Sequence, residues 1–194
     1  MAVPAQQVFL VRHGETEWSL NGRHTGTTDI PLTEHGREVA RLLRPILAKE
    51  SFALALTSPL LRARDTCQLA GFGEVAKVEP DLMEWNYGSY EGLTPAQIHA
   101  TAPGWLLFRD GGPGGEQPGE IGARVDRVIE SARAVEGDVI LFAHGHVLRV
   151  LAARWLGLPP SEGQRFLLGT ATMNILSYYR GVPAIKRWNA PVQF

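Results

Sequence analysis

Short apolar segments alternate with longer segments of helical periodicity along this chain, and this alternation constrains the fold more than any other feature. Apolar runs with the length of buried strands lie at residues 7–11, 52–57, 73–79 and 138–143. Segments with helical spacing of apolar residues lie at 33–50, 58–70 and 118–135, and one more begins after Gly145. Strands that alternate with helices form parallel sheets covered on both faces. We therefore expect an α/β fold, a three-layer α/β/α sandwich with a mostly parallel central sheet.

Three local patterns refine this expectation. Ser58 and Pro59 have the form of an N-cap followed by proline in the first helical turn. Near the end of the chain, segments 172–179 and 184–188 flank a turn at 180–183, which predicts a hairpin at the edge of the sheet. Segment 111–119 is rich in glycine, and we expect it to form a mobile loop; whether it covers the functional site stays open.

Length, charge and cysteine content limit the class of protein. With 194 residues, of which 44% are hydrophobic, we expect one domain over residues 1–194. The net charge of −1 supplies no field for a nucleic acid or an anionic membrane, so neither is an expected partner. The single cysteine and the absence of a leader pattern in residues 1–9 predict a cytoplasmic protein. No apolar run reaches the roughly 20 residues of a membrane-spanning helix.

The residues best suited to chemistry follow three of the predicted strands. Arg12 and His13 end the first, Arg62 lies one helical turn beyond the second, and His144 follows the strand at 138–143. Because the carboxyl ends of parallel strands meet at one edge of a sheet, these side chains are expected to converge there. Cationic donors beside helix N-termini suit a phosphate group. Carboxylates are few at these strand ends, so we expect no metal ion.

Each of these motifs is weak when taken alone. A single His-Gly pair such as His144-Gly145 is more often a turn than a site, and Arg12-His13-Gly14 is hardly more specific. The hypothesis rests on their shared placement, because three separate strand ends deliver phosphate-compatible groups to the same edge. Gly14 and Gly145 fit it, since a residue without Cβ lets backbone donors approach an anion closely.

Four ordered blocks of sequence cover residues 12–146. They are Arg12-His13-Gly14-Glu15-Thr16 with the downstream Thr25-Gly26, then Ser58-Pro59-Leu60-Leu61-Arg62-Ala63, Glu84-Trp85-Asn86-Tyr87-Gly88, and Ala143-His144-Gly145-His146. Together they resemble the histidine phosphatase superfamily, also called phosphoglycerate mutase-like. The resemblance implies a phosphoglycerate mutase-like fold and an enzyme that transfers a phosphoryl group through a phosphohistidine, without a metal ion or other cofactor.

The same resemblance assigns roles to five residues. His13 would be the nucleophile, and Arg12, Arg62 and His144 would bind the phosphoryl oxygens. Glu84 would protonate the leaving oxygen and later take a proton from water. Elementary chemistry agrees, because a neutral imidazole can attack phosphorus in line while cations stabilise charge on the equatorial oxygens.

Further positions are expected to touch the phosphate or the rest of the substrate. They are Ser19, Thr25, Gly26, Tyr87, Gly145 and His146. Ser19 stands where relatives often carry asparagine, so its contact stays open. Tyr87 and His146 are equally compatible with a packed aromatic ring and a turn histidine. Arg109, together with Arg23 or His24, would bind a second phosphate group.

The superfamily holds phosphatases and mutases, so the motifs alone leave the reaction open. Only 33 residues, 88–120, separate the acidic block from the next helix, and Arg109 is the one arginine among them. Cofactor-dependent phosphoglycerate mutases carry a longer, more basic insertion there. We therefore predict a phosphatase for a small phosphorylated metabolite, closest in sequence pattern to the sedoheptulose-bisphosphatase branch, with a sugar phosphate or bisphosphate as substrate. A cofactor-dependent mutase and a non-catalytic phosphate-binding module are the alternatives, and the physiological substrate and any homo-oligomer stay open.

Overall fold

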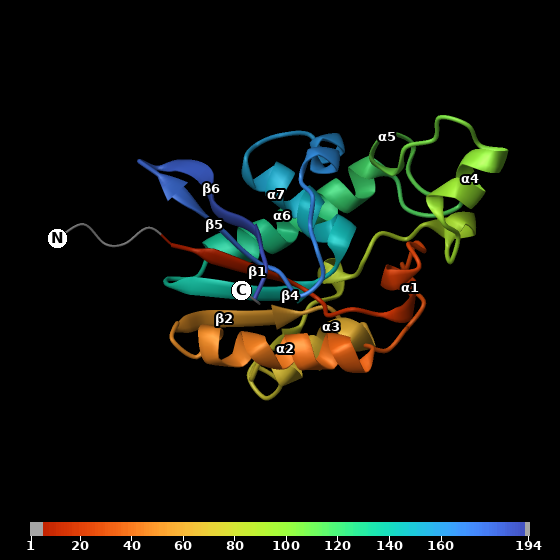
Figure 1. Ribbon diagram of the computed structural model, residues 1–194. Coiled ribbons are helices and arrows are strands. Elements are labelled where there is room, and N and C mark those ends of the chain that lie inside the picture. Colours follow the sequence, from red (N-terminus) through yellow and green to blue (C-terminus); the bar gives the residue numbers. More distant parts are fainter. Residues whose placement is uncertain (1–5, 193–194) are drawn as a thin grey trace.

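A computed structural model describes residues 6–192, and its centre is one six-stranded sheet between two helical layers (Figure 1). The strands are β1 (Val8–Arg12), β2 (Phe52–Thr57), β3 (Lys77–Val78), β4 (Asp138–Ala143), β5 (Met173–Tyr179) and β6 (Val182–Ala190). The α-helices are α1 (Glu17–Leu20), α2 (Glu34–Leu47), α3 (Leu61–Leu69), α4 (Pro95–Thr101), α5 (Leu107–Asp110), α6 (Pro118–Arg133) and α7 (Gly145–Trp155). Short 3-10 helices lie at Pro80–Leu82, Gly88–Tyr90 and Pro160–Arg165.

The strand order across the sheet is β3-β2-β4-β1-β5-β6. The first four strands in this order pair in parallel, and β5 and β6 add an antiparallel edge. This confirms the predicted α/β sandwich with a mostly parallel sheet. The predicted edge hairpin is also confirmed, with a tighter turn than expected, because Arg180 and Gly181 alone link the strands and both have positive φ, 51° and 82°.

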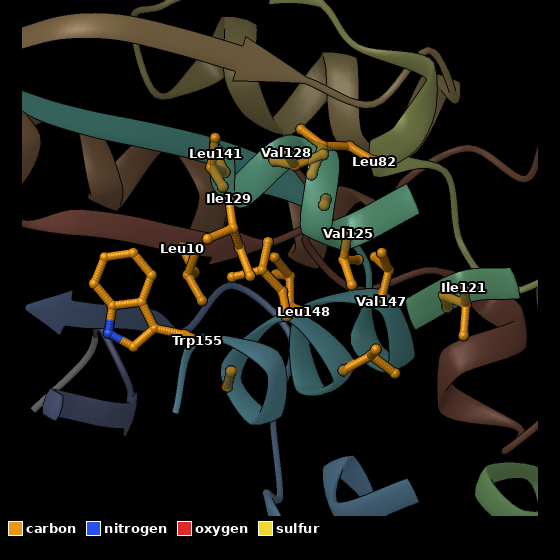
Figure 2. Close-up of a cluster of buried hydrophobic side chains, with 14 of the residues drawn as sticks. Leu10, Leu82, Ile121, Val125, Val128, Ile129, Leu141, Val147, Leu148 and Trp155 are labelled. Atoms are coloured by element: carbon orange, nitrogen blue, oxygen red, sulfur yellow. The ribbon is translucent and has the colours of Figure 1, made fainter. Parts of the chain in front are cut away.

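Both faces of the sheet are buried, which explains why its central strands are continuous apolar runs. On one face, Leu10 of β1 and Leu141 of β4 pack against Val125, Val128 and Leu148 of α6 and α7 (Figure 2). On the other face, alternate strand residues pack against α2 and α3. That second cluster includes Phe9, Val11, Leu43, Leu47, Cys67, Ile140 and Phe142.

The local sequence signals for an N-cap predict one helix start correctly and another incorrectly. Thr33 caps α2 as its sequence predicts, because its side chain accepts a hydrogen bond from the Gly36 N–H at 2.9 Å. The predicted N-cap at Ser58 is wrong: α3 begins at Leu61 without a side-chain cap. The Ser58 hydroxyl is instead hydrogen-bonded to His144, 2.7 Å from its Nε2. The strand predicted over 73–79 is reduced to the two residues of β3.

The glycine-rich segment 111–119 packs against the acidic block, 84–88, rather than over the predicted site. A Cβ on Gly115 would lie 2.3 Å from the Asn86 carbonyl oxygen, so this close packing requires glycine. The Glu116 N–H donates to the same carbonyl at 2.9 Å, and the Glu116 carboxylate pairs with Arg124 at 2.6 Å. The segment thus packs against the acidic block, 84–88, and its mobility stays a prediction.

No helix within residues 6–192 combines the length and the apolar composition that crossing a bilayer requires. The expected lack of a leader rested on residues 1–9, of which 1–5 lie outside the described residues. The expectations of one domain over 1–194 and of a cytoplasmic location stay predictions.

Candidate active site

The carboxyl ends of three parallel strands meet at one edge of the sheet, as the sequence predicted. In the β1–β4 register Arg12 lies opposite Ala143, and the His13 N–H donates to the Ala143 carbonyl at 2.9 Å. The Ser58 N–H donates to the Phe142 carbonyl at 2.9 Å, which aligns the end of β2 with the same edge. Sheet pairing thus places the residues after each strand beside one another.

His13 is held with one ring nitrogen engaged. Its Nδ1 lies 2.7 Å from the Gly14 carbonyl oxygen, which accepts the Nδ1 hydrogen and leaves the Nε2 lone pair free. The pKa of His13 is well below its ordinary value, because burial disfavours the cation and the charges of Arg62 and Arg12 act in the same direction. The imidazole is therefore neutral at neutral pH, which is the form that acts as a nucleophile.

Ser58 fixes the second histidine of the site. The Ser58 hydroxyl oxygen accepts the Leu60 N–H at 3.3 Å and lies 2.7 Å from His144 Nε2. Burial and the charge of Arg62 lower the pKa of His144 well below its ordinary value, so this ring is also neutral. Within residues 6–192 the Ser58 hydroxyl has no other acceptor, so it donates its hydrogen to Nε2, and the single ring hydrogen of His144 is on Nδ1.

Arg62 is fully buried and is anchored by backbone carbonyls. Its guanidinium donates to the carbonyls of Thr28 at 3.0 Å, Thr25 at 3.1 Å and Gly26 at 2.9 Å. The Glu91 carboxylate accepts the N–H of Gly26 at 2.9 Å and holds the same loop from the other side. Arg12 is anchored in a similar way by the Leu168 carbonyl.

Three buried side-chain donors lack a hydrogen-bond partner within residues 6–192. They are Arg12 Nε at the end of β1, Arg62 Nε in the first turn of α3, and His144 Nδ1 directly after β4. The rings of His13 and His144 lie 5.2 Å apart between their centroids. Buried polar groups in native proteins are almost always hydrogen-bonded. A group of three unpaired donors beside a neutral imidazole therefore indicates a site built for an external anion.

Glu84 is fixed by three backbone N–H groups. Its Oε1 accepts from Trp85 and Val147 at 2.9 Å each, and its Oε2 accepts from His146 at 2.9 Å. Two of these donors belong to the first turn of α7, whose own N-cap residue His144 supplies no side-chain bond. The carboxylate therefore satisfies the helix N-terminus. Oε1 accepts two of these hydrogen bonds and Oε2 accepts one, so Oε2 keeps more free acceptor capacity.

A cavity of about 280 Å³ opens over these residues. Its lining consists of Arg12, His13, Ser19, Gly22, Arg23, His24, Thr25, Glu84, Tyr87, Pro95, Gly145, His146, Arg149 and Leu168. Arg62 and His144 lie behind this surface, fully buried. A Cβ on Gly145 would lie 3.3 Å from the Arg12 guanidinium carbon, so a side chain there would crowd Arg12. Within residues 6–192, no cluster of three or more His, Cys, Asp or Glu side chains has an arrangement that could hold a metal ion.

Comparison with known proteins agrees with this geometry. The sequence profile of the histidine phosphatase superfamily (branch 1) matches residues 8–191. The chain belongs to this superfamily. An acid phosphatase of Mycobacterium tuberculosis is 40% identical over 186 residues, which is 94% of this chain and 91% of the relative. The sedoheptulose 1,7-bisphosphatase of Saccharomyces cerevisiae is 37% identical over 184 residues, 77% of this chain and 67% of the relative.

Solved structures of similar proteins share the whole fold. The structure of the open reading frame Rv3214 product from Mycobacterium tuberculosis superposes with a TM-score of 0.93 at 37% identity, over 97% of this chain and 99% of that one. A complex of mycobacterial glucosyl-3-phosphoglycerate phosphatase with VO3 superposes with a TM-score of 0.86 at 32% identity, over 96% of this chain and all (100%) of that one. These matches confirm the phosphoglycerate mutase-like fold and the predicted family.

Two of the predicted substrate contacts, Gly26 and Ser19, are hydrogen-bonded to other residues of the chain. The Gly26 N–H is bound by Glu91 and its carbonyl by Arg62, so Gly26 supports Arg62 and does not line the cavity. Ser19 lines the cavity, but its hydroxyl is used within the α1 capping box with Thr16, at 2.8 and 2.9 Å. Thr25, Tyr87, Gly145 and His146 all line the cavity as expected.

Arg109 does not line the cavity, and its binding of a second phosphate group stays a prediction. Its side chain is exposed in α5 and is paired with Asp110 at 2.7 Å. Arg149 of α7 lines the cavity instead and was missed by the sequence analysis. It follows His146 by three residues on one helix, and residues at that spacing share a face. Helical periodicity after Gly145 was thus a usable signal for Arg149.

Replacing Ser58 by alanine should weaken the binding of inorganic phosphate about tenfold, since His144 loses the hydrogen bond that keeps its hydrogen on Nδ1. The inhibition constant of inorganic phosphate measures this effect. Ser177→Ala is the matched control, because that buried hydroxyl donates to the Gln6 carbonyl at 3.1 Å, away from the cavity lining. Equal inhibition constants in Ser58→Ala and the native protein would show that Ser58 does not orient His144.

Proposed function

We propose that this protein is a phosphatase that hydrolyses phosphate monoesters of small metabolites through a phosphohistidine on His13, without a metal ion or other cofactor. One observation carries the proposal. Unpaired donors on Arg12, Arg62 and His144 surround a neutral imidazole whose Nδ1 is already engaged. Such an arrangement is suited to a phosphoryl group. Its oxygens would accept hydrogen bonds from the three donors, and Nε2 of His13 would face the phosphorus.

The reaction follows in two balanced steps. The lone pair of His13 Nε2 forms a bond to phosphorus, the ester P–O bond breaks, and the leaving oxygen takes the proton from Oε2 of protonated Glu84. Water then gives a proton to the Glu84 carboxylate and attacks phosphorus, and the N–P bond breaks to release inorganic phosphate. Arg12, Arg62 and His144 stabilise the charge on the equatorial oxygens in both steps.

The names of the relatives favour a phosphatase over a mutase. Those named as phosphatases include the acid phosphatase at 40% identity and a glucosyl-3-phosphoglycerate phosphatase of Mycobacterium tuberculosis at 34% identity. A 2,3-bisphosphoglycerate-dependent phosphoglycerate mutase of Gloeobacter violaceus is 33% identical, so a mutase is the alternative that the assay must address. A non-catalytic phosphate-binding module would bind phosphate and release none from an ester.

His13→Ala should abolish phosphate release, because no other group in the proposed mechanism attacks phosphorus. Rapid quench with a radiolabelled ester should trap an acid-labile label on His13 in the native protein, and release should be the same with and without EDTA. His35→Ala is the control, since His35 is exposed and pairs loosely with Glu38 at 3.9 Å. Undiminished activity of His13→Ala would contradict the mechanism. Interconversion of 2- and 3-phosphoglycerate that requires a bisphosphate primer would identify a mutase.

The substrate class we favour is a sugar phosphate or bisphosphate. Arg149 and Arg23 line the same cavity as His13 and supply the cations for a second anionic group, in place of Arg109. The Arg149 guanidinium is held by the carbonyls of Gly163 and Gln164 at 3.1 Å each and lies over the Phe108 ring at 4.6 Å. A fixed guanidinium of this kind binds a phosphate with little loss of conformational freedom.

Arg149→Met should raise KM for a sugar bisphosphate by ~10- to 100-fold relative to the matching monophosphate, because one charge-assisted contact to the second phosphate is lost. Steady-state kinetics on fructose 1,6-bisphosphate and fructose 6-phosphate measure the difference. Arg109→Met, which removes an exposed arginine outside the cavity, should leave both KM values unchanged. A parallel rise of both KM values in Arg149→Met would mean that Arg149 does not recognise the second phosphate.

A further inference from the structure

One hydrogen bond in the cavity wall links the acidic block to the first turn of α7. The Tyr87 hydroxyl lies 2.6 Å from Nδ1 of His146, and both residues line the cavity. Neither residue belongs to the group that surrounds the phosphoryl position. The contact therefore concerns the part of the cavity that receives the rest of the substrate.

The direction of this hydrogen bond follows from the surroundings of Tyr87. The residue is 1% exposed, and within residues 6–192 its hydroxyl contacts no acceptor other than His146 Nδ1. If the imidazole were the donor, the hydroxyl hydrogen would be buried without an acceptor, which is costly. Burial and the charge of Glu84 raise the pKa of Tyr87 well above its ordinary value, so the phenol keeps its hydrogen. Tyr87 is thus the donor.

The imidazole of His146 then has a defined tautomer. Burial and the charge of Arg149 lower its pKa well below the ordinary value, so the ring is neutral and carries one hydrogen. With Nδ1 acting as acceptor, that hydrogen is on Nε2. The Nε2 atom forms no hydrogen bond within the described part of the chain.

Neighbouring aromatic rings fix the plane of the imidazole. The Phe108 ring meets it edge to face at 5.4 Å, and the His24 ring stacks nearly parallel to it, with 12° between the planes and 6.1 Å between centroids. These two contacts fix the plane of the ring, and a 180° flip within that plane would break the Tyr87 hydrogen bond. The orientation of Nε2–H is therefore built into the fold before a ligand arrives.

We propose that Tyr87 is a positioning residue that makes His146 present an Nε2–H donor to the leaving group, so that the cavity selects esters whose leaving group carries a hydroxyl or carbonyl oxygen. This specificity rests on the proposed phosphatase function and adds to it. If Nε2 of His146 carried a lone pair instead of a hydrogen, the cavity would favour a substrate group that donates a hydrogen bond. The Tyr87 hydroxyl sets which of these two tautomers His146 adopts, without touching the reacting atoms.

The test uses two esters with one carbon skeleton, glycerol 1-phosphate and propyl phosphate, of which only the first carries hydroxyl groups. In Tyr87→Phe, the ratio of kcat/KM for glycerol 1-phosphate to that for propyl phosphate should fall ~5- to 10-fold, since one hydrogen bond is lost. His146→Leu should give a similar fall. Tyr87→Phe should add little in the His146→Leu background, because its hydroxyl acts through that ring.

Tyr90→Phe is the matched control, because Tyr90 packs edge to face on Trp105 at 5.0 Å and lies outside the cavity lining. It should leave the substrate ratio unchanged. Nitrogen-15 NMR of the imidazoles gives a readout that does not depend on activity: the hydrogen of His146 should be on Nε2 in the native protein and divided between both nitrogens in Tyr87→Phe.

The proposal is overturned if the native His146 carries its hydrogen on Nδ1, or if Tyr87→Phe leaves the substrate ratio unchanged. Additive losses in the double variant would also overturn it, since Tyr87 would then act independently of His146. Absence of hydrolysis of both esters by the native protein would contradict the phosphatase function itself. The NMR result would still decide the tautomer in that case.

Discussion

The carboxyl edge of the sheet buries donors that no group within residues 6–192 satisfies, and the arrangement of the site depends on this constraint. Arg62 is kept in place by three carbonyls of the 25–28 loop, and Glu91 holds that loop from its other side. Donors fixed in this way are ready for an anion before it binds, so little reorganisation is required at the moment of reaction. These carbonyls offset the cost of burying the Arg62 cation, and its Nε has no hydrogen-bond partner within the described residues.

The same constraint sets the chemical state of His13. Burial, with the charges of Arg62 and Arg12 acting in the same direction, lowers the pKa of His13. The positive charge of the anion site therefore adds to burial in keeping this imidazole neutral. Glu84 completes the site from the opposite wall, where the first turn of α7 supplies two of its three hydrogen-bond donors.

The sequence predicted those parts that depend on local pattern or on strand topology. Central strands were recognisable because burial on both faces makes them continuously apolar, and parallel pairing then brought His13 and His144 together. Ser58 was misassigned because its cap signal is local, whereas its hydroxyl serves a histidine 86 residues away. The helix α4 was missed although Thr94 and Gln97 form a capping box, a pattern that was present in the sequence. Arg109 and Arg149 could not be ranked from sequence, because the decisive pairing of Arg109 with Asp110 is a property of the folded surface.

The most direct test of the central claim is a crystal structure of the protein with bound orthovanadate, which resembles a phosphoryl group in transfer. We predict that vanadate oxygens accept hydrogen bonds from Arg12, Arg62 Nε and His144 Nδ1, and that Nε2 of His13 lies in line with the vanadium atom. An anion bound elsewhere at full occupancy, or a His13 ring with Nε2 turned away from it, would contradict the account.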